Sequence, residues 1–166
     1  MSLDIALLYT DNDIANENFL HQMECSTISW NNTGRTMLYG RRKLIEMSKA
    51  DYIWLIDADD FVLETPKGYE GYDVTFYNGN KQAQWSRVVR TNLLKDLPNY
   101  NLNYLEDAFT YYWLIRKKPT INEVRQNIYK YNGKHHNIEK WEVPAYRKAL
   151  FDISHYLLKG ENINGQ

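Results

Sequence analysis

The chain lacks the features that mark disulfide-bonded, metal-cluster and membrane proteins. It has a single cysteine, Cys25, among its 166 residues, which excludes an intrachain disulfide and any cysteine-rich zinc site. No apolar run approaches the length that crosses a bilayer. The N-terminal segment has neither the basic leader nor the small-residue cleavage site of a signal peptide. These absences predict a cytoplasmic protein without a membrane span.

The chain also lacks an excess of charge of either sign. Twenty Lys and Arg residues against 21 Asp and Glu residues leave a formal net charge of −1. Nucleic acid is therefore not indicated as a partner, because nonspecific binding to it requires a basic surface. The sequence has no repeat, no low-complexity tract and no interdomain linker. We expect one domain over residues 1–160, since 166 residues give room for one, and a flexible tail over 161–166.

What is present indicates a folded α/β domain. Apolar residues make up 43% of the chain and charged residues 25%, enough for a core. In the first sixty residues, short apolar runs typical of strands alternate with segments whose apolar residues have helical spacing. This order predicts parallel strands joined by right-handed crossovers. The expected strands are 5–10, 27–30, 52–56, 73–77, 84–91 and 128–131. The expected helices are 13–22, 35–49, 104–117 and one that begins at Pro144 and ends at Gly160.

Acidic residues follow the most apolar of these strands. Asp57-Ala58-Asp59-Asp60 comes directly after Tyr52–Ile56, and Thr10-Asp11 ends the first strand. Ligands of open α/β sheets bind beyond the carboxyl ends of strands. Three carboxylates within four residues repel one another unless a cation compensates, and a divalent metal with oxygen ligands fits that need. A solvated acidic turn is the alternative.

Five further residues are candidates for chemistry. Arg41 lies on or beside the apolar stripe of its helix, where it meets an anion such as phosphate or extends to solvent. Glu106 and Asp107 complement a helix dipole, or act as a base in partly buried aromatic surroundings. His135 and His136 point different ways because they are adjacent, so at most one joins a metal or phosphate site. Surface imidazoles are the alternative.

These features together resemble one family. The turn Asn32-Thr33-Gly34, the helix with Arg41-Arg42 and the strand that ends in Asp57-Ala58-Asp59 are similar to family 2 glycosyltransferases of the GT-A fold, in which a DxD motif ends that strand. Leu105-Glu106-Asp107 resembles the ED motif of the family. Tyr129-Lys130-Tyr131 with His135 or His136 resembles its late Tyr-Arg-x-His stretch, with Lys130 at the Arg position. The chain is shorter than most members between the DxD-like and ED-like segments.

The resemblance implies a fold and an activity. The fold would be a Rossmann-related three-layer α/β/α sandwich of GT-A type with a mostly parallel central sheet. The activity would be metal-dependent, inverting transfer of a sugar from a nucleotide-diphosphate donor, most simply a UDP-sugar, to the hydroxyl of an unidentified acceptor. The alternatives are a metal-dependent phosphoryl or nucleotidyl transferase or nuclease, and a non-catalytic module that binds nucleotide sugars.

The resemblance also implies a role for each site residue. Asp107 would take the proton of the acceptor, with Glu106 orienting it. The nucleotide sugar would contact Thr10, Asp11, Arg41, Asp57 and Ala58. Mn²⁺ or Mg²⁺ would be held by Asp59, Asp57, and His135 or His136.

Overall fold

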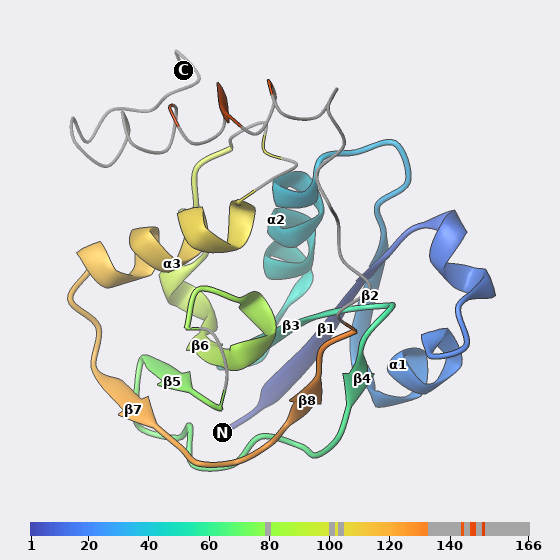
Figure 1. Cartoon of the computed structure of the whole chain (residues 1–166). Coiled ribbons are helices and arrows are strands. Elements are labelled where there is room, and N and C mark those ends of the chain that lie inside the picture. Colours follow the sequence, from blue (N-terminus) through green and yellow to red (C-terminus); the bar gives the residue numbers. More distant parts are fainter. Residues whose placement is uncertain are drawn as a thin grey trace.

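A six-stranded sheet forms the centre of the described part of the chain (Figure 1). The structure is a computed structural model that describes residues 1–78, 81–99, 102 and 105–132, with residues 144, 147, 148 and 151. The strand order is β2-β1-β3-β6-β5-β7. The strands are β1 (Leu3–Tyr9), β2 (Ile28–Asn31), β3 (Tyr52–Asp57), β5 (Val74–Phe76), β6 (Arg87–Arg90) and β7 (Ile121–Glu123).

The sheet is mostly parallel, as expected. β1 pairs in parallel with β2 and β3, and β5 pairs in parallel with β7, whereas β6 runs antiparallel to both of its neighbours. The register places Leu8 opposite Asp57, so β1 and β3 end at the same edge of the sheet. The residues that follow these two strands are therefore neighbours in space, which is the arrangement that the sequence predicts for Thr10 and the acidic turn (Asp57–Asp60).

Both faces of the sheet are covered. One face packs against α2 (Met37–Met47) and α3 (Glu106–Arg116). The other packs against α1 (Phe19–Cys25) and a small antiparallel sheet of β4 (Phe61–Val62) and β8 (Tyr129–Lys130). β3 is buried on both faces, which explains its uninterrupted apolar sequence.

The α/β class is confirmed, and the second outer layer is only partly helical. The connection from β3 to β5 holds the short strand β4 and no helix within residues 58–73, so a two-stranded sheet covers part of this face. The strand expected at 128–131 forms as β8, but it pairs with β4 outside the central sheet. No helix in the described ranges is long and apolar enough to cross a membrane.

Three other segments differ from the expected elements. The predicted helix 13–22 is a 3-10 helix (Asp11–Ala15) followed by α1, because the backbone is extended at Asn16. The predicted strand 84–91 begins with a 3-10 turn, so β6 starts only at Arg87. The final helix is seen at Pro144 and three later residues, and the rest of it, like the predicted tail 161–166, lies outside the described residues.

Gly40 lets α2 lie unusually close to the sheet. A Cβ atom at this position would lie 2.5 Å from Leu8 Cδ1 and 2.6 Å from Asn32 Cγ, closer than real Cβ contacts come. Thr36 caps the start of the helix, where its side chain accepts a hydrogen bond from the amide of Tyr39. The close contact fixes the distance between β1 and the next residue of α2, Arg41.

Candidate active site

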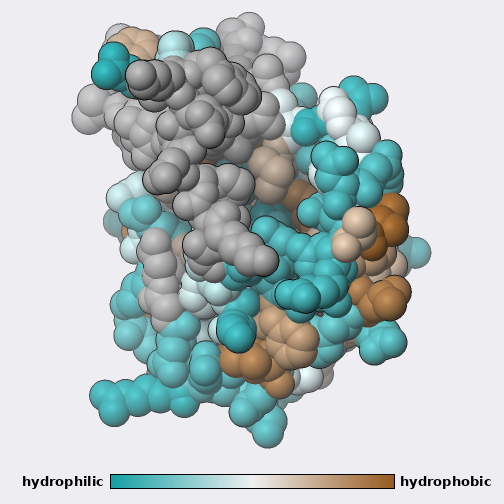
Figure 2. Space-filling model, turned by 45° about the vertical axis from the view of Figure 1, so that its right-hand side comes forward, coloured by the Kyte–Doolittle hydropathy of each residue, from teal (hydrophilic) through white to brown (hydrophobic). Residues whose placement is uncertain are grey.

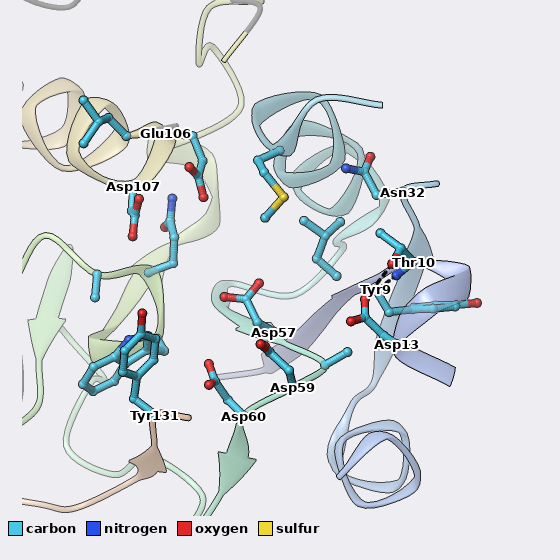
Figure 3. A pocket seen from close by; sticks show the side chains of 17 residues that line it. Tyr9, Thr10, Asp13, Asn32, Asp57, Asp59, Asp60, Glu106, Asp107 and Tyr131 are labelled. Atoms are coloured by element: carbon cyan, nitrogen blue, oxygen red, sulfur yellow. Dashed lines mark hydrogen bonds between the residues drawn. The ribbon is translucent and has the colours of Figure 1, made fainter. Parts of the chain in front are cut away.

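A cleft of about 650 Å³ opens where β1 and β3 end (Figure 3). The acidic turn lies between two walls. Tyr9, Thr10 and Asp13 lie on one side, and Glu106, Asp107 and Tyr131 on the other. Six carboxylates line the cleft: Asp13, Asp57, Asp59, Asp60, Glu106 and Asp107. The described residues that line it include no lysine, arginine or histidine. The cleft is thus strongly acidic and suits a ligand that brings a cation with it.

The acidic turn is fixed by contacts from other elements rather than left as a solvated loop. The amide of Asp57 donates to the Tyr129 hydroxyl at 2.9 Å, and Gln22 of α1 donates through Nε2 to the carbonyl of Asp57 at 2.7 Å. The carbonyl of Asp59 accepts from Asn132 Nδ2 at 3.1 Å. A turn held this way keeps its carboxylates in place before a ligand arrives, which favours the functional interpretation.

Asp60 is the buried member of the turn. Its residue is 1% exposed, and its Oδ1 accepts from the amide of Asn132 at 2.7 Å. Burial raises the pKa of Asp60 to about 7, and the nearby charges of Asp57 and Asp59 add to that shift.

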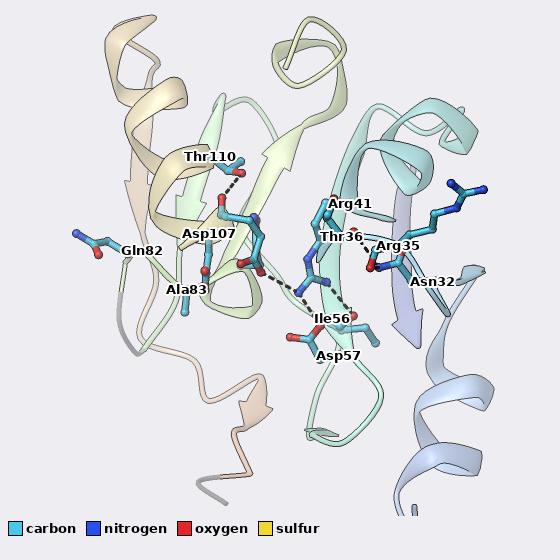
Figure 4. Close-up of polar contacts among 12 residues, drawn as sticks. Asn32, Arg35, Thr36, Arg41, Ile56, Asp57, Gln82, Ala83, Asp107 and Thr110 are labelled. Atoms are coloured by element: carbon cyan, nitrogen blue, oxygen red, sulfur yellow. Dashed lines mark hydrogen bonds and ion pairs between the residues drawn. The ribbon is translucent and has the colours of Figure 1, made fainter. Parts of the chain in front are cut away.

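Arg41 is a buried cation inside the carboxylate cluster (Figure 4). It is 1% exposed. Its Nη2 lies 2.6 Å from Asp57 Oδ1 and 3.8 Å from Glu106 Oε1, and Nη1 donates to the carbonyl of Ile56 at 3.4 Å. Burial by itself would lower the pKa of Arg41, but the carboxylates of Asp57 and Glu106 raise it, so the guanidinium stays charged.

The geometry shows which charged groups Arg41 contacts within the protein. It meets an anion, as its position on the apolar stripe of α2 suggested, but the anions are the protein's own carboxylates. Arg41 is not among the residues that line the cleft, and its charged partners within the protein are Asp57 and Glu106. Its expected place near the nucleotide stays a prediction. It acts on the site by holding two carboxylates from different elements, β3 and α3, near each other.

Glu106 and Asp107 begin α3 and point into the cleft from its first turn. The preceding residue, Leu105, has a left-handed backbone (φ 60°), which costs a residue with a Cβ about 1 kcal/mol. Burial raises the pKa of Glu106 to about 8, the charge of Asp107 adds to the shift, and Arg41 opposes it. Burial also raises the pKa of Asp107, against the opposing effects of Arg41 and Arg87. A carboxylate with a raised pKa is suited to accept a proton.

Arg87 was not predicted as a site residue, yet its hydrogen bonds connect the segments that form one wall of the cleft. Its guanidinium is fully buried and donates to the carbonyls of Lys81 and Gln82 at 2.9 and 2.7 Å. It also donates to Gln84 Oε1 at 2.9 Å and to the carbonyl of Asp107 at 3.1 Å. Burial lowers the pKa of Arg87 to about 10. The sequence gives no signal for this role, because Arg87 lies within a segment that reads simply as a strand.

Aromatic rings from two distant segments also meet at the cleft and were not predicted there. Trp85 stacks on Tyr131, with ring centroids 5.9 Å apart and planes 21° apart. It stacks equally on Tyr129, at 5.4 Å and 15°. Tyr129 and Tyr131 belong to the stretch that resembles the late family motif, but that resemblance gave neither ring a role. For Trp85 the only sequence signal was the high aromatic share of 14%.

The opposite wall contains some, but not all, of the residues predicted to bind nucleotide. Thr10 and Ala58 line the cleft. Asp11 does not, and its carboxylate accepts from Asn31 Nδ2 at 2.7 Å on the exposed side. Asp13 lines the cleft and was missed; it accepts from the amide and hydroxyl of Thr10 at 2.6 and 3.0 Å. His135 and His136 lie outside the described residues.

The carboxylates fit a divalent ion that arrives with a ligand better than a resident one. In the described ranges, no group of three or more His, Cys, Asp or Glu side chains is placed to hold a metal alone. Asp57 and Asp59 nevertheless both line the cleft. Mg²⁺ is typically bound by one or two carboxylates together with the phosphate oxygens of a substrate. The oxygen donors present match that mode, and Asp57 and Asp59 would be the protein ligands.

Known proteins resemble the chain in structure but not detectably in sequence. No protein-family model and no curated protein matches it. A crystal structure of S. aureus TarS residues 1–349 superimposes with a TM-score of 0.54 at 14% identity, over 77% of this chain and 60% of that one. The same fragment with UDP gives 0.54 at 15% identity, over 80% and 60%. With UDP-GlcNAc it gives 0.50 at 13%, over 83% and 60%.

This likeness shows the fold. TarS is a glycosyltransferase of GT-A type, and the chain has the same type of α/β fold. The chain spans about 60% of the length of the TarS 1–349 structures.

The buried Glu106 makes a testable contribution to stability. Its pKa in the folded protein is about 8 against an ordinary 4.5, so the native state binds this proton more tightly than the unfolded chain. The free energy of unfolding should therefore fall as pH rises from about 4.5 to 8. Glu106→Gln removes the titration, so at pH 8.5 it should be more stable than wild type by on the order of 1–3 kcal/mol, and similar at pH 5.

Urea unfolding at the two pH values measures this effect. Glu24→Gln, a change at an exposed glutamate of α1, is the matched control and should leave the pH dependence of wild type intact. An unchanged pH dependence in Glu106→Gln would contradict the assignment of the titrating proton to Glu106.

Proposed function

We propose that this chain is a glycosyltransferase that moves a sugar from a UDP-sugar to an acceptor hydroxyl, with inversion at the anomeric carbon. One observation carries the proposal. The acidic turn at the end of β3 and Asp107 at the start of α3 share one cleft, so a site for a diphosphate–metal pair and a candidate base flank the same space. The similarity of the fold to TarS structures with UDP and UDP-GlcNAc supports the choice of donor.

The donor would span the cleft from the β1 wall to the acidic turn. In this proposal the nucleoside lies beside Thr10 and Asp13, and the diphosphate lies over Asp57 and Asp59. Asn32, 2% exposed, lines the same side, and its buried Oδ1 has no hydrogen-bond partner among the described residues. A buried acceptor without a donor is costly unless a ligand supplies one, so Asn32 is a candidate contact for the nucleoside.

Asp59, with Asp57, would hold Mn²⁺ or Mg²⁺ against the diphosphate. A divalent ion bound there would neutralise the negative charge that UDP gains as the glycosidic bond breaks. One oxygen of Asp57 is already occupied by Arg41 at 2.6 Å. Asp59 stands at the last position of the DxD-like Asp57-Ala58-Asp59 and lines the cleft, and we assign it as the principal ligand.

Asp107 would act as the general base. The acceptor hydroxyl attacks the anomeric carbon from the face opposite the diphosphate, its proton passes to the Asp107 carboxylate, and the bond to the phosphate oxygen breaks with its electron pair leaving on UDP. A single displacement of this kind inverts the anomeric centre and needs no nucleophilic side chain. Glu106, held near Arg41, would orient Asp107 or the acceptor.

A thermal-shift experiment with Asp59→Ala tests donor binding. At 100-fold excess over Kd, UDP with Mn²⁺ should stabilise wild type by about 2.7 kcal/mol, or roughly 5–10 °C in Tm. Asp59→Ala should lose that shift. Asp11→Ala is the matched control and should keep it, because Asp11 lies outside the cleft. An equal shift with and without Mn²⁺ in wild type would count against the role of Asp59, and phosphodiester cleavage would favour the nuclease alternative.

A further inference from the structure

Three stacked rings, Tyr129, Trp85 and Tyr131, form an aromatic platform at one end of the cleft. Tyr129 anchors the platform: it is 4% exposed, contacts Trp54 edge to face at 5.8 Å, and its hydroxyl accepts from the amide of Asp57. Tyr131 is 48% exposed, and both it and Trp85 line the cleft. The platform thus presents aromatic surface to the cleft while its base is fixed to the core and to the acidic turn.

The platform lies at the end of the cleft that holds the candidate base. Figure 3 shows Tyr131 and Asp107 on one side of the acidic turn, with Thr10 and Asp13 on the other. Arg87 connects the two, because it donates to the carbonyl of Asp107 and to the side chain of Gln84, the residue before Trp85. A general base must lie within hydrogen-bond reach of the proton that it accepts. The acceptor therefore has to enter this end, beside the rings.

The charge of the cleft limits what that acceptor can be. Six carboxylates and no basic side chain line it among the described residues. A bound divalent ion would be offset by the diphosphate, and none of the described lining residues is basic, so a phosphate-bearing polymer or a nucleic acid would find no cationic partner at this end. Figure 2 shows one face of the molecule, which is mainly hydrophilic with smaller hydrophobic areas.

Gln84 is an independent indication of a ligand site, because one of its buried polar atoms lacks a hydrogen-bond partner among the described residues. It is 3% exposed and lines the cleft next to Trp85, and its Oε1 is fixed by Arg87. Its Nε2 has no acceptor within the described part of the chain. Buried amides are normally paired, so a ligand hydroxyl at this end would satisfy a donor that the protein leaves open.

We propose that the acceptor is an uncharged saccharide, whose pyranose ring packs on Tyr131 and Trp85 while one of its hydroxyls faces Asp107. The C–H face of a pyranose is apolar and packs on an aromatic ring, whereas its hydroxyls point outward, toward the carboxylate and the amide of Gln84. This inference rests on the proposed function, because it takes Asp107 as the group that receives the acceptor proton. It adds the chemical class of the acceptor and the residues that select it.

Saturation-transfer NMR with small glycosides tests the proposal. The probes are the methyl β-glycosides of glucose, galactose and N-acetylglucosamine as neutral rings, and methyl β-glucuronide as the anionic counterpart, each with and without UDP and Mn²⁺. At least one neutral glycoside should receive saturation, strongest on the protons of one ring face, with the glucuronide about tenfold weaker. Tyr131→Ala should weaken neutral binding about tenfold, and Tyr131→Phe should retain it.

A control variant and a separate measurement of donor binding distinguish failure of this inference from failure of the proposed function. Tyr72→Ala removes an exposed tyrosine outside the cleft and should bind the glycosides as wild type does. Equal binding in Tyr131→Ala and wild type, equal binding of the glucuronide, or no binding of any neutral glycoside would each overturn the inference. The proposed function fails by a different result, the absence of a Tm shift with UDP and Mn²⁺ in wild type, and Tyr131→Ala should keep that shift in full.

Discussion

Replacing Arg41 with methionine should destabilise the protein by about 3 kcal/mol, the cost typical of removing one partner from a buried ion pair. Methionine fills a similar volume but leaves the Asp57 and Glu106 carboxylates without the cation that lies 2.6 and 3.8 Å from them. The two carboxylates then repel each other and move apart or take up a proton. Urea unfolding at pH 7 measures the loss, and the UDP–Mn²⁺ thermal shift should be lost with it.

The neighbouring residue supplies the control. Arg42 is partly exposed, donates to the carbonyl of Leu97 and lies 3.9 Å from Glu46, so Arg42→Met should cost about 1 kcal/mol or less. Combining Arg41→Met with Glu106→Gln should recover part of the lost stability, because one of the unpaired carboxylates is gone. If Arg41→Met were as stable as Arg42→Met, the buried pair would not organise the site.

Asp107→Asn should reduce sugar transfer by about 10³-fold, within the usual contribution of a general base. Asparagine keeps the shape of the side chain but cannot accept the proton of the acceptor. The donor should still bind, so the UDP–Mn²⁺ thermal shift should match that of wild type. The rate of UDP release from a panel of UDP-sugars, with a neutral glycoside as acceptor, measures the loss.

Asp96→Asn is the matched control for this change. Asp96 is exposed and pairs with Lys117 away from the cleft, so its amide variant should release UDP at the wild-type rate. A wild-type rate in Asp107→Asn would remove Asp107 from the reaction. No UDP release by wild type from any UDP-sugar would favour a module that binds nucleotide sugars without turning them over.

The sequence predicts best those elements that can be recognised from the runs or the spacing of their own apolar residues. Tyr52–Ile56 reads as a strand buried on both faces, and β3 lies between two other strands with both faces covered. α2 and α3 lie within the predicted ranges because apolar spacing defines them. The shared edge of β1 and β3 follows from parallel pairing, and this brings Thr10 and the acidic turn together. The roles of the predicted site residues remain predictions.

What the sequence does not predict depends on contacts between distant segments. The partners of Arg41 come from β3 and α3, and no local pattern states that a buried arginine is paired with the protein's own carboxylates rather than a phosphate. Trp85 and Tyr131 meet only because β8 folds back beside the 3-10 turn before β6. β7 was missed because Ile121 and Glu123 are exposed on an edge strand, which leaves no apolar alternation to detect.

The absence of a side chain at Gly40 ties the chemistry of the cleft to the spacing of a helix and a sheet. α2 can pack against Leu8 and Asn32 only because no side chain projects from this position. The resulting distance between helix and sheet determines how far the guanidinium of the next residue, Arg41, extends toward Asp57. A single methyl group here would lift the helix, lengthening the gap that Arg41 bridges to Asp57. The charge balance of the pocket is therefore set, in part, by a residue that has no functional group at all.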